Sequence, residues 1–127
     1  MEQELIVKSN KLLQHPLYKN SLELKLFSRI ILEVRKNPNE DIITFKIKDL
    51  LEKLDCNKND YAMIKKISES MDRRVDINED KENIFSDTVH IFRRITIDKQ
   101  GIIVFKVEED IKPYILNLTN NFTQYYF

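Results

Sequence analysis

The side chains that could perform catalysis are few and scattered along the chain. The two histidines, His15 and His90, lie far apart, and neither has a second ligand at metal-site spacing. The single cysteine, Cys56, has no adjacent histidine that would activate it as a nucleophile. The acidic run Glu108-Glu109-Asp110 is typical of the start of a helix rather than of a cation site. We therefore expect no enzyme activity, no metal and no cofactor.

A second group of side chains has the types that contact DNA, where cations meet phosphates and amides or hydroxyls meet base edges. Acidic residues are mixed among them, so residues 59–75 carry four basic and three acidic side chains, a net charge of only +1. Charge alone therefore leaves DNA binding open. The candidate DNA-binding residues are Asn59, Tyr61, Lys65, Lys66, Ser68 and Arg73, followed by Arg93, Arg94, Lys99 and Gln100.

Composition limits the class of protein. The 127 residues suffice for one domain with a hydrophobic core and are too few for two. Hydrophobic residues make up 42% and charged residues 33%, the balance of a globular protein rather than a disordered or membrane protein. A single glycine excludes a glycine-rich phosphate loop. One cysteine and the lack of a signal peptide predict a cytoplasmic location.

The net charge is zero, from 21 basic and 21 acidic side chains. Proteins that coat DNA without selectivity carry a large basic excess, so this chain is not of that kind. The charges are unevenly spread, with +3 over residues 1–36, −4 over 76–88 and +3 over 89–107. Separate basic and acidic surfaces explain this pattern, and so does solvated charge on loops and helices.

Hydrophobic spacing predicts the elements that must position these residues. Residues 5–13 form either a short helix or an arm. Apolar residues spaced by three and four predict a helix over 21–36, with Ser21 as its N-cap. A β-rich run over 42–47 predicts a short strand.

Two further helices are expected on either side of a polar turn. The first covers 48–54 with Asp49 as its cap, and the second covers 60–75. Two helices joined by a tight turn are typical of a helix-turn-helix, although any pair of packed helices gives the same pattern.

A β-hairpin is predicted after the acidic segment. Strands over 89–98 and 102–108 are joined by a type I turn that Gly101 closes in the left-handed conformation. Arg94 then lies opposite Lys106, and two opposed cations suggest an anionic partner or a solvated surface. The remaining pairs are Ile97 with Ile103, Ile95 with Phe105 and Arg93 with Val107, which gathers the apolar side chains Ile95, Ile97, Ile103 and Phe105 on one buried face.

The end of the sequence is expected to contain a short helix and a strand. Asp110 caps the helix, with Pro113 tolerated in its first turn, and 122–127 forms the strand. Because the last residues are aromatic and would leave apolar surface uncovered, we expect the sequence to be part of a longer protein. The order helix, strand, helix, turn, helix and hairpin predicts an α+β winged helix.

Six stretches also carry a resemblance to a known family. They are Val-Lys-Ser-Asn-Lys-Leu at 7–12, Ser-Leu-Glu-Leu-Lys-Leu at 21–26, Phe-Lys-Ile-Lys-Asp-Leu at 45–50, Tyr-Ala-Met-Ile-Lys-Lys-Ile-Ser-Glu-Ser-Met at 61–71, Ile-Lys-Pro-Tyr-Ile-Leu-Asn-Leu at 111–118 and Asn-Phe-Thr-Gln-Tyr at 121–125. In this order the chain resembles, over residues 5–127, the N-terminal half of the initiator replication proteins of iteron-containing bacterial plasmids. Leu24 departs from the glutamine expected in the first helix.

The resemblance implies that residues 1–127 are the first of two winged-helix domains. It implies double-stranded DNA as a partner, with monomers binding the origin iterons through both domains. It also implies a homodimer, joined mainly through this first domain, that represses the initiator's own gene. The resemblance further implies that this domain changes conformation as dimers become monomers. Host replication proteins are a further class of partner that the resemblance allows, and a membrane is not.

Three functions remain open at this point. In the first, the domain contacts DNA through the second helix and the hairpin wing. In the second, it is purely a dimerisation and regulatory module with negligible DNA binding of its own. In the third, it is a winged-helix transcription regulator unrelated to replication.

Overall fold

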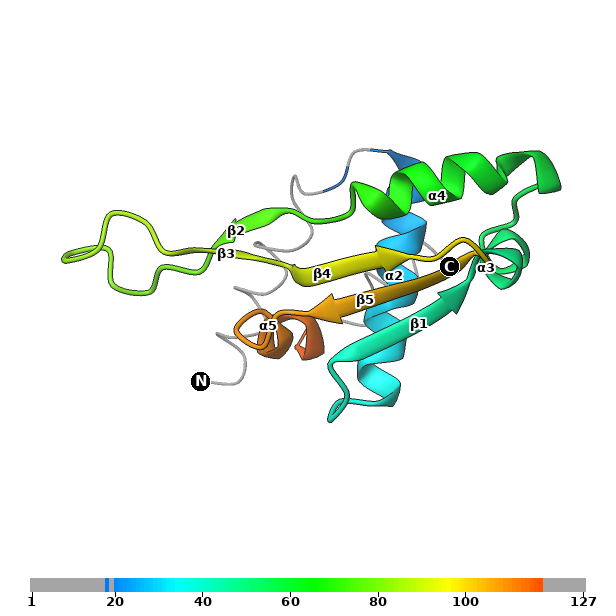
Figure 1. Cartoon of the computed structure of the whole chain (residues 1–127). Coiled ribbons are helices and arrows are strands. Elements are labelled where there is room, and N and C mark those ends of the chain that lie inside the picture. Colours follow the sequence, from blue (N-terminus) through cyan, green and yellow to red (C-terminus); the bar gives the residue numbers. More distant parts are fainter. Residues whose placement is uncertain (1–17, 19, 118–127) are drawn as a thin grey trace.

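A three-stranded antiparallel sheet carries the fold, and helices cover one of its faces (Figure 1). The computed structural model describes residue 18 and residues 20–117, so the predictions for 5–13, His15 and 122–127 lie outside the described residues. The elements in order are α2 (Ser21–Lys36), β1 (Ile42–Lys46), α3 (Ile47–Lys53), the 3-10 turn η1 (Lys58–Asp60), α4 (Tyr61–Glu69), β2 (Arg74–Asp76), β3 (Thr88–His90), β4 (Phe92–Ile97), β5 (Ile102–Val107) and α5 (Lys112–Leu116).

Helix α2 has the predicted span, but its N-cap is one residue earlier than expected. The side chain of Asn20 accepts a hydrogen bond from the backbone N–H of Leu22 at 2.8 Å, so Ser21 is the first helical residue and not the cap. The predicted apolar stripe is confirmed, because α2 buries its side chains at spacings of three and four. The buried hydrophobic side chains of α2 are Leu26, Phe27, Ile30, Ile31 and Val34.

Helix α3 starts directly from β1 and ends in a Schellman turn. The prediction that Asp49 caps α3 is wrong, because the cap position is Lys46 and Asp49 lies in the first turn. At the other end Asp55 adopts a φ of 57° and its N–H bonds to the carbonyl of Glu52 at 3.1 Å. The N–H of Cys56 bonds to the carbonyl of Leu51 at 2.7 Å. These two bonds close the helix and turn the chain toward α4.

Helix α4 is shorter than predicted, and the chain after it becomes extended. It ends at Glu69 instead of continuing to Val75, which lies in β2 opposite Val89 of β3. The spacing from Met71 to Val75 fitted a helical stripe, and both side chains are buried, but they belong to different local structures. The strand predicted over 89–98 is likewise divided into β3 and β4 at the buried residue Ile91.

The sheet order is β1-β5-β4, so the strand before the helix-turn-helix pairs with the last strand of the hairpin. Three predicted pairs are confirmed, namely Ile97 with Ile103, Ile95 with Phe105 and Arg94 with Lys106. The predicted pairing of Arg93 with Val107 is wrong. The register shifts at Arg93, so that Phe92 lies opposite Val107. The extra residue moves Phe92 onto the face of Ile95, where it is buried, and leaves Arg93 exposed.

Gly101 in the hairpin turn has the predicted left-handed conformation. Gly101 has a φ of 85°, and the carboxylate of Asp98 accepts hydrogen bonds from the N–H groups of Gln100 at 2.8 Å and Ile102 at 2.9 Å. The carbonyl of Gly101 accepts a bond from the N–H of Ile47 at 2.9 Å. The turn is therefore fixed to the first residue of α3.

Helix α5 is held to the start of β1. The prediction that Asp110 caps this helix is wrong, because Ile111 occupies the cap position and makes no side-chain capping bond, while Pro113 does lie in the first turn. The Lys112 ammonium donates to the Asp41 carboxylate at 2.8 Å and to the carbonyl of Glu40 at 3.0 Å.

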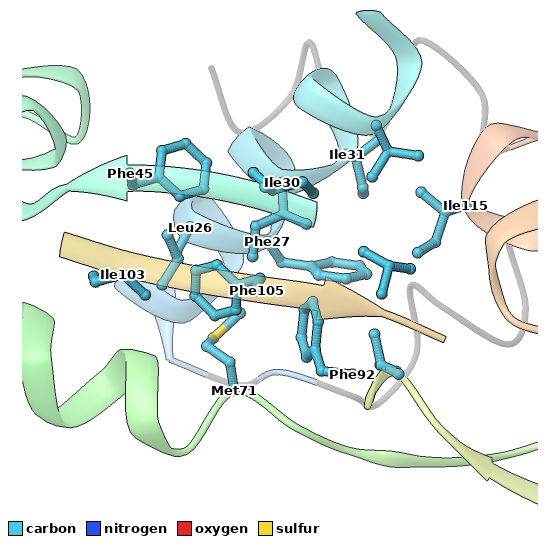
Figure 2. Packing of buried hydrophobic residues seen from close by; sticks show 14 of the residues in the cluster. Leu26, Phe27, Ile30, Ile31, Phe45, Met71, Phe92, Ile103, Phe105 and Ile115 are labelled. Atoms are coloured by element: carbon cyan, nitrogen blue, oxygen red, sulfur yellow. The ribbon is translucent and has the colours of Figure 1, made fainter. Parts of the chain in front are cut away.

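The core lies between the sheet and α2 (Figure 2). Phe105, in the central strand, lies in the middle of the core. The centroid of its ring is 6.1 Å from that of Phe45 and 5.1 Å from that of Phe92. Ile103 and Phe105 are fully buried and Ile95 and Ile97 pack against them, which confirms that the four share the inner face. The outer face carries polar and apolar side chains, and no described element covers it.

Candidate nucleic-acid interface

The exposed side of η1 and α4 presents positive charge on a well-anchored helix start. Asn57 and Asp60 form a capping box, in which the Asp60 carboxylate accepts the N–H of Asn57 at 2.8 Å. Buried Ile64 holds the helix against the core, so Lys65 and Lys66 are exposed. We call this surface the basic face of α4. It consists of Lys58, Asn59, Met63, Lys65 and Lys66, all exposed.

The wing tip lies beside the start of α4. The hydroxyl of Tyr61 touches Gly101 so closely that a Cβ at this glycine would overlap it. Tyr61 is 36% exposed, and both tip residues, Lys99 and Gln100, are exposed. The fold thus brings Tyr61, at the start of α4, against the tip of the hairpin.

Two of the candidate DNA-binding residues are placed where they contact the protein itself. Ser68 is fully buried, so its hydroxyl cannot reach a base edge in this conformation. Arg73 lies beyond the end of α4, and its guanidinium is 2.7 Å from the Glu23 carboxylate and 4.9 Å from the ring centre of Tyr18. Both residues lie outside the basic face of α4.

The two arginines of β4 lie away from the wing tip. The Nε of Arg93, in the bulge, lies 3.6 Å from the Glu108 carboxylate, and this ion pair partly neutralises the arginine. Arg94 is exposed on the outer face of the sheet beside Lys106. It is four residues from the turn, or about 13 Å along the strand.

Two exposed lysines near this surface were not among the candidates. Lys58 is part of η1, and Lys46 is the last residue of β1, opposite Ile102 and next to the hairpin turn. Lys58 sits in the polar turn before α4, a position from which it could have been selected. Lys46 is brought close only by the pairing of β1 with β5, which the local pattern does not encode.

A comparison with known protein families gives a single clear result. Residues 5–127 match the family model described as "Initiator Replication protein, WH1". The chain belongs to this family of replication initiators. The match confirms the resemblance seen in the sequence, and with the mixed helix and sheet content it confirms the winged-helix fold. The chain matches no curated protein and no solved structure at a significant level.

His90 and Asp72 form a structural contact. His90 Nδ1 lies 2.5 Å from one carboxylate oxygen of Asp72, whose other oxygen accepts the N–H of Phe92 at 3.1 Å. The shallow hollow around this pair has no hydroxyl or thiol side chain among its lining residues. Burial raises the pKa of the Cys56 thiol, which disfavours the reactive thiolate.

Within residue 18 and residues 20–117, no group of three or more His, Cys, Asp or Glu side chains converges as a metal site requires. No helix in these same ranges is both long and apolar enough to span a bilayer.

Proposed function

We propose that this replication initiator domain binds duplex DNA at the iterons of a plasmid origin, with the basic face of α4 and the wing tip against the DNA. The observation that carries the proposal is the exposure of Lys65 and Lys66 on α4 close to a hairpin that presents Lys99. None of these three ammonium groups forms an ion pair within the described residues, so each is available to a phosphate.

The proposal has further parts that rest on the family assignment. We propose that the chain is the first of two winged-helix domains, that it acts in the cytoplasm by binding rather than by catalysis, and that it forms a homodimer. Host replication proteins are proposed as additional partners. The family assignment favours a replication initiator over the alternative of an unrelated transcription regulator.

A second candidate function is supported by the outer face of the sheet. Ile42 is 53% exposed there, and the half-buried Ile102 and Val104 of β5 share this face. An apolar surface of this kind favours contact between proteins. In this alternative the domain serves only for dimerisation and regulation, and a stable dimer that does not bind iteron DNA would support it.

A salt titration of iteron DNA tests the proposal. Fluorescence anisotropy of a labelled iteron duplex should give a Kd of roughly 10⁻⁴ to 10⁻⁶ M for the 1–127 chain, the range of phosphate-dominated binding. Lys65→Ala and Lys99→Ala should each lower the slope of log K against log salt by about one, because each removes a phosphate contact. Asn59→Ala should instead relax the preference at one base pair.

Lys36→Ala is the matched control, because Lys36 is exposed at the far end of α2 and only a weak surface ion pair at 3.7 Å with Glu33 would be lost. It should leave the slope unchanged. Equal slopes for wild type, Lys65→Ala and Lys99→Ala would move the DNA surface elsewhere.

A further inference from the structure

An acidic arm projects from one end of the molecule. It consists of residues 76–88, the loop that joins β2 to β3, and it extends past the sheet at the end opposite the β4–β5 turn and the start of α4 (Figure 1). Phe85 is completely exposed on this arm, at 101%, and Ile84 is 43% exposed. Aromatic side chains are enriched where proteins meet, so the exposed ring marks the arm as an interaction surface.

Hydrogen bonds hold the arm in one shape. The N–H of Ile77 donates to the carbonyl of Asp87 at 2.8 Å and closes the loop at its base. The Asn78 amide donates to the carbonyl of Ile84 at 2.7 Å, and the N–H of Ile84 donates to the carbonyl of Asp80 at 2.9 Å. Because an ordered loop loses less conformational entropy on binding than a flexible one, the arm is prepared for a partner.

The base of the arm meets α5 and forms an open hollow with it. The Tyr114 hydroxyl donates to the Glu79 carboxylate at 3.1 Å. Beside this contact lies a hollow of about 490 Å³, with Ile84 and Tyr114 among its apolar walls and no Lys, Arg or His among its lining residues. A hollow of this kind fits the aliphatic stem and the cationic head of a lysine or arginine. Its carboxylates are those of Glu79, Asp80, Asp87 and Asp110.

The charge of the arm selects the class of partner. A net charge of −4 repels the phosphates of DNA and attracts a basic protein surface. Because the arm lies at the opposite end from the wing tip and the start of α4, it stays uncovered when these bind DNA as proposed (Figure 1). The arm is therefore free for a second protein while the domain is on DNA. Its charged residues are Asp76, Glu79, Asp80, Glu82 and Asp87, with Lys81 as the one cation.

We propose that the acidic arm is the docking site for a basic amphipathic segment of a host replication protein. An apolar side chain of that segment packs on Phe85, and a neighbouring lysine or arginine enters the carboxylate-lined hollow. This inference rests on the proposed function, because it names the surface through which the DNA-bound domain recruits such a partner.

A peptide of this chemistry tests the docking site on the 1–127 chain. The probe is a fluorescent helical peptide with leucines along one face and lysines on both flanks, and anisotropy measures its Kd. Binding should be saturable and should weaken as salt is added. Phe85→Ser should raise the Kd by about tenfold, since truncation of a central aromatic anchor is costly.

Two adjacent arm residues of opposite charge give a matched pair of variants. Glu82 and Lys81 are both exposed. Glu82→Lys should raise the peptide Kd and Lys81→Glu should lower it, because the first removes attraction for the lysines and the second adds to it. Glu52→Lys makes the same change in net charge on α3, at the other end of the molecule, and should leave the Kd nearly unchanged (Figure 1).

A second peptide, with serines in place of the leucines and the same charge, separates the apolar contact from the electrostatic one. It should bind wild type more weakly, and Phe85→Ser should not weaken it further. No saturable binding of the leucine peptide to wild type would overturn the inference, and so would an equal Kd for wild type and Phe85→Ser. If Phe85→Ser alone turned a dimer of the chain into monomers in sedimentation, the occupant would be a second copy and the inference would be wrong.

Titration of an iteron duplex separates this inference from the proposed function. Phe85→Ser should bind the duplex with wild-type affinity, because the arm stays off the DNA. A weaker affinity would place Phe85 in the DNA interface and overturn the inference. If neither protein binds the duplex while the leucine peptide still distinguishes wild type from Phe85→Ser, the proposed function fails and the docking site stands.

Discussion

Ser68 shows at the residue scale how burial decides what a side chain can do. Its hydroxyl is fully buried in α4 and finds no hydrogen-bond partner among the described residues. Ser28 in α2 is equally buried, but its hydroxyl donates to the carbonyl of Leu24 at 2.9 Å. The two serines therefore form a matched pair of buried hydroxyls, of which Ser28 has a hydrogen-bond partner and Ser68 has none among the described residues.

Ser68→Ala should raise the free energy of unfolding by about 1 kcal/mol, because it removes a buried unpaired hydroxyl and introduces a better helix former. Ser28→Ala makes the same gain in helix propensity but loses a hydrogen bond. These effects oppose each other, so its free energy of unfolding should change by less than about 0.5 kcal/mol. Urea unfolding of the two variants measures the difference. A Ser68→Ala variant less stable than Ser28→Ala would contradict this account, and lost DNA sequence preference would return Ser68 to the interface.

The exposure of single side chains was predictable where local geometry decides it. Lys65 and Lys66 follow from helical spacing, and Lys99 follows from the turn. Arg73 and Arg93 could not be assigned in the same way, because each is engaged by a partner, Glu23 or Glu108, that lies 50 or 15 positions away in the sequence. Such pairings depend on the tertiary fold and leave no trace in spacing.

At the scale of elements, Gly101 couples the wing to α4. Its φ of 85° disfavours any residue with a Cβ, and the Tyr61 hydroxyl occupies the place where that Cβ would be. Gly101→Ala should therefore lower the free energy of unfolding by about 1 kcal/mol from backbone strain alone, and by more when Tyr61 must shift.

A double-mutant cycle with Tyr61→Ala measures the contact between the elements by chemical unfolding. In that background Gly101→Ala should retain the cost of the left-handed backbone and lose the cost of the overlap. The same destabilisation in both backgrounds would show that Tyr61 does not press on the wing tip.

The boundaries of the elements were the least predictable feature. Asn20 and Ser21 are both good capping residues, and only the hydrogen bond that the Asn20 side chain accepts from the N–H of Leu22 selects Asn20. Beyond the early end of α4, the Asp72 carboxylate accepts a hydrogen bond from the N–H of Phe92 in β4, a contact between residues 20 positions apart. The bulge at Arg93 is needed to bury Phe92, whereas strict alternation of side chains would expose it.

At the scale of the whole molecule, the Asp41–Lys112 pair joins segments 71 positions apart. The hydrogen bond from Lys112 holds the pKa of Asp41 below its usual value of 3.8, against the opposing effect of burial. A lowered pKa means that the pair stabilises the fold above the unfolded-state value, and that this contribution is lost as the pH falls through the lower folded-state value.

Asp41→Asn should lower the free energy of unfolding at pH 7, and the deficit relative to wild type should shrink as the pH falls below about 4. Urea midpoints at a series of pH values measure this. Glu40→Gln, an equal loss of charge at the exposed neighbouring residue, is the control and should show a smaller deficit. An Asp41→Asn deficit that grows toward acid would contradict the sign of the pKa shift.

The order of elements was predictable because each has its own signal: helical stripes, a β-rich run and a glycine-closed turn. The winged-helix arrangement follows from that order together with the pairing of β1 and β5. The separate β2–β3 ribbon was missed, since the apolar spacing around Val75 fitted a longer helix equally well. The loop that joins β2 to β3, at residues 76–88, was visible in the sequence only as a run of acidic residues.

The proposed function places the basic face of α4 and the wing tip against iteron DNA. Tethered cleavage tests it most directly, with the native thiol removed as Cys56→Ser and an iron–EDTA group attached to a single cysteine in Lys66→Cys, Lys99→Cys or Lys36→Cys. We expect positions 66 and 99 to cut an iteron duplex in clusters within the repeat, and position 36 not to cut it above background. Cleavage from position 36 alone, or none from positions 66 and 99 at saturating protein, would contradict it.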